Sequence, residues 1–283
     1  MFHEIAPRRF DNSFVNREAD ESDCALIYNE NGIVLVKEGE YFRFPLMKEV
    51  QAKHAVSRYA FAIDGQGYFI VLGDDIKVQK STETVGFTDL RNIDPMYIGF
   101  AGMLGKQLYR FFHQRKYCGC CGTKTHFSDT EQAIICPSCH HVEYPKISPA
   151  IIVAIVNEDK LLMTKYAYGN YKKYALVAGF VEFGESFEEA VKREVKEEVG
   201  LNVKNVKYFK NQPWPFSDSQ MVGFFAELDG DDKVTLQEEE LSEAVWFTRE
   251  EIPRNDNSVS ISYELIEAVR SGDVTYYLNS KYS

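Results

Sequence analysis

Closely spaced carboxylates dominate the stretch from Gly179 to Leu201. If this stretch forms a helix, Glu194 and Glu198 lie one turn apart inside its apolar, core-facing stripe. The rest of that stripe is Ala190, Val191 and Val195. A carboxylate buried without compensation is costly, and such a break in the apolar pattern is typical of a functional site. With Glu197 beside it, the pair suits a divalent cation, which prefers oxygen ligands.

The helix that must position this pair has clear ends. Ser186 and Glu189 have the spacing of a capping box, and Gly200 is a typical helix terminus. The alternative is an acidic amphipathic helix whose glutamates are all solvated. That explanation suits Glu188 and Glu189, which point away from the apolar stripe, but it does not suit the pair within it.

Five of the six cysteines lie between residues 118 and 139. Two C-x-x-C pairs are separated by 14 residues: Cys118 with Cys121, and Cys136 with Cys139. This spacing predicts a zinc ribbon, in which four thiolates close a tetrahedral structural site with no position open for chemistry. Cys120 offers an alternative register, and His140 or His141 could replace the last ligand. Cys24 is expected to be a core thiol.

Composition indicates a globular chain with a large core. It has 283 residues, of which 45% are hydrophobic and 27% charged. The net charge of −11 argues against extended binding to the phosphate backbone of a nucleic acid.

The N-terminus has charge and proline where a signal peptide needs an apolar core, and no apolar run approaches the roughly 20 residues of a membrane span. We expect a cytoplasmic protein without a membrane partner, with an organellar address as the alternative.

The chain divides into three expected parts. Residues 1–95 alternate short apolar runs with turn signals, which predicts strands at 25–28, 33–36, 41–46, 59–63 and 68–72. Apolar residues then recur at helical spacing to Phe112. We therefore expect an α+β protein with a β-rich N-terminal domain ending in a helix (1–112), a zinc ribbon (113–146) and a C-terminal domain of strands and helices (147–283). In the last part we expect strands at 150–156, 161–166, 174–178, 203–209, 221–228 and 244–247, and a closing helix at 258–270.

The carboxylate stretch resembles the Nudix box, G-x5-E-x7-R-E-U-x-E-E-x-G-U, in which U is a bulky aliphatic residue. Every position matches: Gly179, Glu185, Arg193, Glu194, Val195, Glu197, Glu198, Gly200 and Leu201. The resemblance implies that the C-terminal domain is a Nudix α/β/α sandwich. It also implies hydrolysis of a nucleoside diphosphate linked to another group.

A second stretch, NQPWPFSDS at 211–219, resembles the S-Q-P-W-P-F-P-x-S signature of the NADH pyrophosphatase subfamily. The matching residues are Gln212, Pro213, Trp214, Pro215, Phe216 and Ser219. Asn211 replaces a serine, and Ser217 replaces a proline that would stiffen the loop. Two prolines around a tryptophan predict a stiff loop whose aromatic faces can stack on a flat base.

The resemblance assigns roles position by position. Glu194 and Glu198 fall on the metal-binding glutamates, and Glu197 on a third metal group or the base for the attacking water. Glu185 falls on the glutamate that pairs with Arg193. Further metal ligands are implied at the carbonyl of Ala178 and at Glu240, with Glu238 and Glu239 as competitors for the latter. The implied substrate-binding residues are Tyr144, Phe180, Gln212, Pro213, Trp214, Pro215, Phe216, Ser217, Asp218, Ser219 and Ser262.

The resemblance implies a Mg²⁺- or Mn²⁺-dependent pyrophosphatase that splits NAD(H) into NMN(H) and AMP and holds one structural zinc per chain. It also implies a homodimer with shared active sites, because Tyr144 of one chain and Phe180 of the other would stack on the same adenine. One alternative is removal of the NAD cap from RNA 5′ ends by the same chemistry. The others are a catalytically silent NAD-sensing module and a zinc-ribbon adaptor for nucleic acid.

Overall fold

The computed structural model describes residues 1–169, 173–254 and 259–279. The chain divides into two compact units. The first unit is Phe2–Lys146, and the second is Met1 together with Ile147–Ser283. The further division of the first unit at residue 112 stays a prediction. Within the described ranges, no helix is long and apolar enough to cross a membrane.

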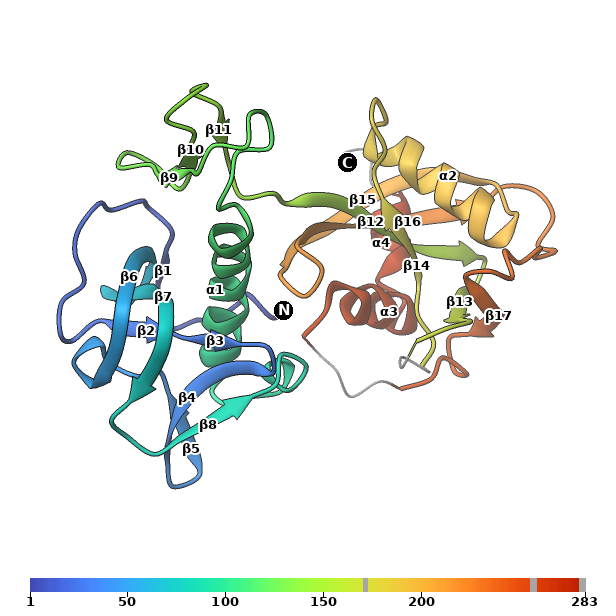
Figure 1. The fold of residues 1–283 in the computed structure, drawn as a ribbon. Coiled ribbons are helices and arrows are strands. Elements are labelled where there is room, and N and C mark those ends of the chain that lie inside the picture. The colour runs from blue at the N-terminus through green and yellow to red at the C-terminus, as the bar shows by residue number, and fades with distance from the viewer. Residues whose placement is uncertain (170–172, 255–258, 280–283) are drawn as a thin grey trace. The chain divides into compact units, whose positions relative to one another are not determined.

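The first unit is rich in strands and contains one long helix (Figure 1). One sheet has the order β1-β6-β7-β2, and its members are β1 (Phe10–Asp11), β6 (Val50–Ile63), β7 (Gln66–Val78) and β2 (Cys24–Leu26). A second has the order β3-β4-β5 with β8 paired to β4, and its members are β3 (Tyr28–Asn29), β4 (Gly32–Glu38), β5 (Tyr41–Arg43) and β8 (Thr82–Val85). Short 3-10 turns span Met47–Glu49 and Asp89–Arg91. The predicted helix is α1 (Met96–Gln114).

The hairpin of β6 and β7 is longer than the sequence predicts. The apolar runs at 59–63 and 68–72 cover only its buried half. Its outer half continues to Val50 and Val78 through mostly exposed residues, which carry no apolar signal. The predicted strand at 41–46 in turn ends already at Arg43.

The segment with the cysteine pairs forms three two-residue strands in the order β11-β10-β9. These are β9 (His126–Phe127), β10 (Ile134–Ile135) and β11 (Val142–Glu143). The two cysteine turns lie outside these strands, so backbone pairing holds the turns in place while the side chains remain free to converge.

The second unit is built on a six-stranded sheet in the order β15-β16-β12-β13-β17, with β14 paired to β12. The strands are β12 (Ser148–Asn157), β13 (Lys160–Tyr166), β14 (Val177–Phe180), β15 (Val203–Trp214), β16 (Ser219–Leu228) and β17 (Leu241–Thr248). The helices are α2 (Phe187–Val199), α3 (Ile261–Ser271) and α4 (Val274–Asn279). The parallel pairing of β12 with β16 begins at Ser148 and Ser219.

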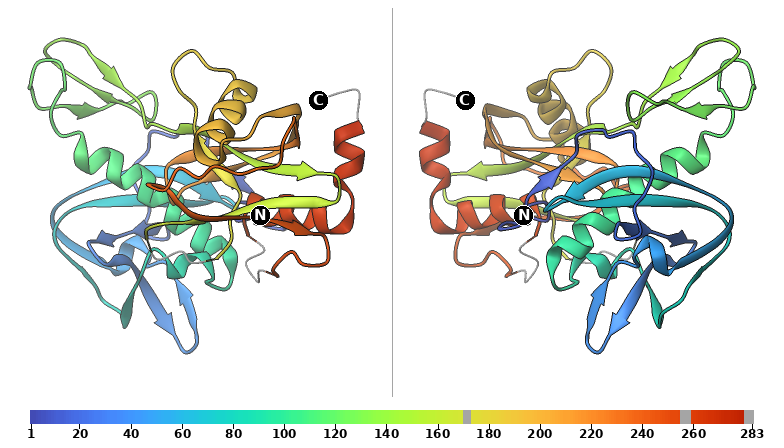
Figure 2. Two further views of the ribbon diagram at one scale, coloured as in Figure 1. Left: turned by 90° about the vertical axis from the view of Figure 1, so that its right-hand side faces the viewer. Right: turned by 90° about the vertical axis from the view of Figure 1, so that its left-hand side faces the viewer.

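The sheet has a hydrophobic core on each face, and this confirms the predicted α/β/α sandwich. Ile151, Val153 and Ile155 of β12 share one core with the buried face of α2. The alternating residues Ile152, Ala154 and Val156 share the other core with α3. A strand buried on both faces reads as a continuous apolar run, which is how β12 appears in the sequence. Both ribbon views show α2 and α3 on opposite sides of the sheet (Figure 1 and Figure 2).

Several predicted boundaries in this unit differ from those in the structure. The strand expected at 174–178 begins at Val177 and continues to Phe180. The closing helix, expected from 258, begins at Ile261 with Ser260 as its cap, and residue 258 lies outside the described ranges. The strand expected at 203–209 continues to Trp214, so the first part of the 211–219 stretch is strand and not loop. Proline is tolerated there at Pro213 because β15 is an edge strand.

Candidate active site

Helix α2 has the two ends expected from the sequence. The Ser186 hydroxyl accepts a hydrogen bond from the Glu189 amide at 3.2 Å, and the Glu189 carboxylate accepts one from the Ser186 amide at 2.8 Å. Gly200 ends the helix in the left-handed conformation, with φ of 73°, which glycine adopts at little cost. The apolar side of the helix packs into the sheet core, which fixes the direction in which its glutamates point.

Arg193 is the centre of an ion cluster at the start of this site. Its guanidinium donates two hydrogen bonds to the Glu185 carboxylate, at 2.6 and 2.9 Å. It also donates to Glu194 at 2.8 Å, to Glu197 at 2.9 Å and to the carbonyl of Phe180 at 2.9 Å. These bonds engage five donor positions, the full capacity of arginine. The Arg193 guanidinium lowers the pKa of Glu185 to about 2, so this carboxylate stays ionised.

A cavity of about 360 Å³ opens beside this cluster. Four glutamates contribute to its described lining: Glu182, Glu194, Glu198 and Glu240. No basic side chain is among the described lining residues. A pocket of this charge repels an anionic ligand unless cations occupy it.

Burial and mutual repulsion act on the two inner carboxylates. The Glu198 side chain is buried, and burial together with the nearby carboxylates of Glu194 and Glu240 raises its pKa to about 8. Burial also raises the pKa of Glu194, against the opposing effect of Arg193. For both carboxylates, burial disfavours the charged form more than nearby positive charge favours it.

The donors at this cavity are carboxylate and carbonyl oxygens, the ligand type that divalent cations such as Mg²⁺ prefer. Within the described ranges, no donor is hydrogen-bonded to the Glu198 carboxylate, although its residue is only 4% exposed. A buried carboxylate in that position requires either a proton or a cation. Ala178 also lines this cavity, and the role of its carbonyl as a metal ligand stays a prediction. Glu197 is exposed and bonded to Arg193, and it is not among the described lining residues.

Residue 179, the first glycine of the box, must be small for a steric reason. Gly179 lies on β14, opposite Ile151 of β12. A Cβ atom at this position would lie 2.0 Å from the Glu194 carboxyl group. Glycine therefore leaves the room that the Glu194 carboxylate occupies.

The stretch 211–219 forms the end of the β15–β16 hairpin. Ser217 and Ser219 line the cavity, with 2.8 Å between their hydroxyl oxygens. Ser217, which replaces a proline of the signature, thus adds a hydroxyl group to the cavity lining. The rings of Trp214 and Phe216 lie 4.8 Å apart. Six of the predicted substrate-binding residues in this stretch are not among the described lining residues: Gln212, Pro213, Trp214, Pro215, Phe216 and Asp218.

The substrate-binding role that the resemblance implied for Gln212 stays a prediction, and in this structure its side chain has partners within the protein. Its side chain is fully buried. The amide donates to the carbonyl of Val259 at 2.8 Å and accepts from the backbone amide of Ile261 at 2.8 Å. Gln212 therefore joins β15 to the start of α3 and is not open to a substrate in this geometry.

The remaining predicted residues are spread over both units. Phe180 is 52% exposed and lines the cavity. Tyr144 belongs to the first unit, is exposed, and donates its hydroxyl to Glu131 at 3.1 Å. Ser262 lies in the first turn of α3, outside the described lining.

Comparison with known proteins places the chain in a family. The NUDIX domain family matches residues 146–269. The chain is 40% identical over 192 residues to the NAD-capped RNA hydrolase NudC of Shigella boydii serotype 18, covering 68% of this chain and 74% of the relative. The chain belongs to the Nudix hydrolase family. The protein of the same name from Salmonella schwarzengrund is 42% identical over 163 residues, covering 58% of this chain and 63% of that one.

These relatives confirm the NADH pyrophosphatase subfamily predicted from the 211–219 signature. Among solved structures, the chain is similar to a NUDIX hydrolase from Nitrosomonas europaea, with a TM-score of 0.49 and 26% identity. That match covers 56% of this chain and 93% of the other. Membership of the Nudix family agrees with the requirement for a divalent metal that the donor set indicates.

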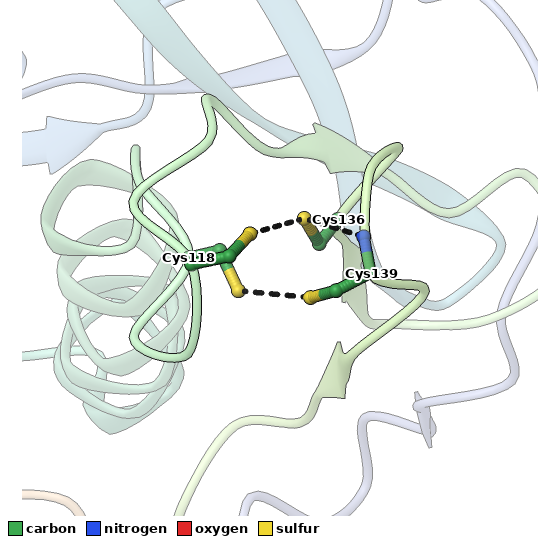
Figure 3. Close-up of side chains that lie close together, drawn as sticks. Cys118, Cys136 and Cys139 are labelled. Carbon is green, nitrogen blue, oxygen red and sulfur yellow. Dashed lines mark hydrogen bonds between the residues drawn. The ribbon is translucent and has the colours of Figure 1, made fainter.

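The cysteine cluster in the first unit of this Nudix protein has the geometry of a zinc site. Its four sulfur atoms all lie within 4.8 Å of one another, the only such group of metal-ligating side chains among the described residues. The Cys118–Cys139 and Cys121–Cys136 sulfur pairs are 3.6 and 3.4 Å apart. A tetrahedron with Zn–S bonds of 2.3 Å has sulfurs about 3.8 Å apart. Figure 3 shows Cys118, Cys136 and Cys139 pointing toward a common centre.

Two further residues of the cavity lining are not predicted from the sequence. Ala150 and Met221 line it as register partners on the parallel strands β12 and β16, and Ala150 also pairs with Phe180 of β14. No local pattern marks these two residues. The register of two strands about 70 residues apart in the chain is set only when the sheet forms.

Proposed function

We propose that this Nudix protein hydrolyses the pyrophosphate bond of NAD(H), giving NMN(H) and AMP. The observation that carries the proposal is the glutamate cavity, with four carboxylates and no basic residue in its described lining. A dinucleotide pyrophosphate is an anion, so it can enter only when cations neutralise the carboxylates. The signature at 211–219 and the relatives named NudC support NAD(H) as the dinucleotide.

Glu194, Glu198 and Glu240, with the carbonyl of Ala178, are proposed to hold Mg²⁺ or Mn²⁺. An all-oxygen donor set suits both ions. When bound, the metal supplies charge neutralisation at the phosphoryl oxygens and lowers the pKa of a bound water. The reaction is an in-line displacement, so positioning and electrostatics carry most of the rate.

The residues around the cavity are proposed to position these groups. Arg193 fixes the Glu194 carboxylate and, through the Phe180 carbonyl, the end of β14. Glu185 holds Arg193 from the other side with two hydrogen bonds. We assign Glu197 to this cluster as well. To act as the base for the attacking water, the Glu197 carboxylate would have to turn away from Arg193.

The adenine is proposed to stack on Phe180, which is exposed beside the cavity. We also propose a homodimer in which Tyr144 of one chain completes the site of the other. Tyr144 is exposed and belongs to a different unit from Phe180. Stacking of a base on an aromatic side chain contributes about 1–3 kcal/mol.

NAD-capped RNA is a second candidate substrate, favoured by the name of the relatives, NAD-capped RNA hydrolase. The bond is the same one, and the leaving nucleotide carries the RNA chain. The net charge of −11 favours the free dinucleotide over an RNA that needs extended phosphate contacts.

Both substrates can be tested with purified protein and Mg²⁺ or Mn²⁺. NADH and a short NAD-capped RNA are supplied separately, and products are identified by mass spectrometry. Release of NMNH and AMP from NADH supports the main proposal, and comparison of kcat/KM for the two substrates ranks them. Cleavage of the capped RNA with no release of AMP from NADH would overturn the main proposal in favour of the second. Binding of NADH with cleavage of neither substrate would instead support a sensing module.

A further inference from the structure

The first unit contains a second cavity, with a volume of about 490 Å³. It lies between strand β7, the end of α1 and the segment that carries β9. It shares no described lining residue with the glutamate cavity. Its volume is within the range of small-molecule binding sites.

The lining of this cavity is basic in a chain of net charge −11. Arg115, Lys116 and Lys124 contribute cations, and Asp74 is the one acidic residue in the described lining. Arg115 forms an ion pair with Glu143. Within the described ranges, neither lysine forms an ion pair with a carboxylate.

The two lysines are held by backbone pairing. The Thr125 amide donates to the carbonyl of Lys116 at 3.0 Å, and Lys124 forms an isolated antiparallel bridge with Tyr117. Their Cα positions are therefore fixed, although the side chains can adapt. Two lysines in the lining of one cavity are a favourable partner for phosphate, which accepts charge-assisted hydrogen bonds.

Ring-bearing side chains complete the lining. Three of the six histidines of the chain are present: His54, His113 and His126. The imidazole of His113 stacks on the phenol ring of Tyr109, with 5.3 Å between ring centres and an angle of 16° between the planes. A stacked pair of this kind offers a flat face for another ring, as aromatic side chains do for bases.

We propose that this cavity binds a nucleoside phosphate. Lys116 and Lys124 receive the phosphate, and the base lies against the stacked pair of His113 and Tyr109. A cationic and aromatic cavity can take such an anion without added metal, whereas the glutamate cavity cannot. The site is therefore distinct from the proposed active site and does not depend on the proposed function.

The test uses the full chain with its zinc and without added Mg²⁺ or Mn²⁺. Binding of AMP and of inorganic phosphate is measured by calorimetry. Three double variants are compared with the parent: Lys116→Ala/Lys124→Ala, the charge-matched control Lys48→Ala/Lys80→Ala, and Glu194→Gln/Glu198→Gln. Lys48 and Lys80 are exposed and lie outside the described lining.

We expect AMP to bind more tightly than phosphate, because the base adds stacking. Affinity for AMP falls on the order of tenfold or more in the Lys116→Ala/Lys124→Ala variant. It is unchanged in the Lys48→Ala/Lys80→Ala control, and it is not lowered in Glu194→Gln/Glu198→Gln. His113→Ala lowers the affinity for AMP but not that for phosphate. If AMP binds equally well to Lys116→Ala/Lys124→Ala and to Lys48→Ala/Lys80→Ala, the proposed site is wrong. Equal affinity for AMP and phosphate overturns the nucleotide assignment. So does binding of a 5′-phosphorylated RNA without binding of AMP, which would indicate an RNA surface.

Discussion

The Glu194 carboxylate can occupy its position only because residue 179 has no side chain. We expect Gly179→Ala to displace that carboxylate, since the added Cβ would lie 2.0 Å from it. Activity should fall by about 10- to 100-fold with little change in thermal stability, because the clash is with the flexible end of a side chain. Gly119→Ala is the control, since a Cβ there meets nothing within 4 Å. Unchanged activity in Gly179→Ala would show that Glu194 can act from elsewhere.

Glu198 predicts a pH dependence of stability in protein without added Mg²⁺ or Mn²⁺. Its folded-state pKa is about 8, above the ordinary value of 4.5, so the folded state binds the proton more tightly. The contribution of Glu198 to the free energy of unfolding is fully present below pH 4.5 and is lost as the pH rises through 8. From pH 5.5 to 8.5 the free energy of unfolding should fall by on the order of 3 kcal/mol through this group. Both tryptophans, Trp214 and Trp246, report on this unit by fluorescence.

Glu198→Gln supplies the comparison, because it removes the titrating group and keeps the side-chain volume. We expect its stability to vary less between these pH values than that of the parent. Mg²⁺ added at pH 8.5 should restore stability to the parent and not to the variant. Identical pH profiles for the two proteins would contradict the assignment of the raised pKa to Glu198.

At the scale of elements, Gln212 joins β15 to α3 from a fully buried position. Gln212→Ala leaves the Val259 carbonyl and the Ile261 amide without this partner. We expect a loss of about 2–4 kcal/mol in the free energy of unfolding, because unsatisfied buried groups cost about 1–3 kcal/mol each. Urea unfolding followed by tryptophan fluorescence measures it, with Gln220→Ala as a less buried control. A raised KM at unchanged stability would instead restore Gln212 to the substrate-binding role that the resemblance implied.

The cysteine turns give a second prediction at this scale. Cys121→Ser should lower the zinc content from one ion per chain and destabilise the first unit, because three thiolates remain. Cys120→Ser should retain the ion, since Cys120 is not in the group whose ligand atoms converge. Metal analysis by mass spectrometry and thermal unfolding decide the question. If only Cys120→Ser loses the zinc, then Cys120 and not Cys121 is the zinc ligand.

The sequence could predict those elements whose boundaries are set by residues within the same stretch of chain. Helix α2 has its cap and its end within its own stretch, so its span and the direction of Glu198 follow from spacing alone. The role of Gln212 could not be predicted, since its partners lie 47 and 49 residues further along the chain. Ala150 and Met221 depend on the parallel register of β12 and β16. The basic cavity likewise brings together segments that are distant in the chain.

At the scale of the whole molecule, the proposed homodimer can be tested by mixing variants. Tyr144→Ala should raise KM more than it lowers kcat, because base stacking is chiefly ground-state binding. If Tyr144 and Glu198 serve one site from opposite chains, a heterodimer of Tyr144→Ala and Glu198→Gln has one intact site. Activity at low substrate should then return in part on mixing. No recovery after demonstrated subunit exchange means that each chain builds its own site.

The proposed function requires the glutamates of one cavity to hold the cation that assists hydrolysis of NAD(H). The most direct measurement is the rate of AMP release from NADH in the parent, Glu198→Gln and Glu188→Gln. Glu188 is an exposed glutamate of the same helix outside the described lining, so it controls for the loss of one charge. We predict a loss on the order of 10²-fold or more in Glu198→Gln, with folding kept, and near-parent turnover in Glu188→Gln. Near-parent turnover in Glu198→Gln would contradict the account.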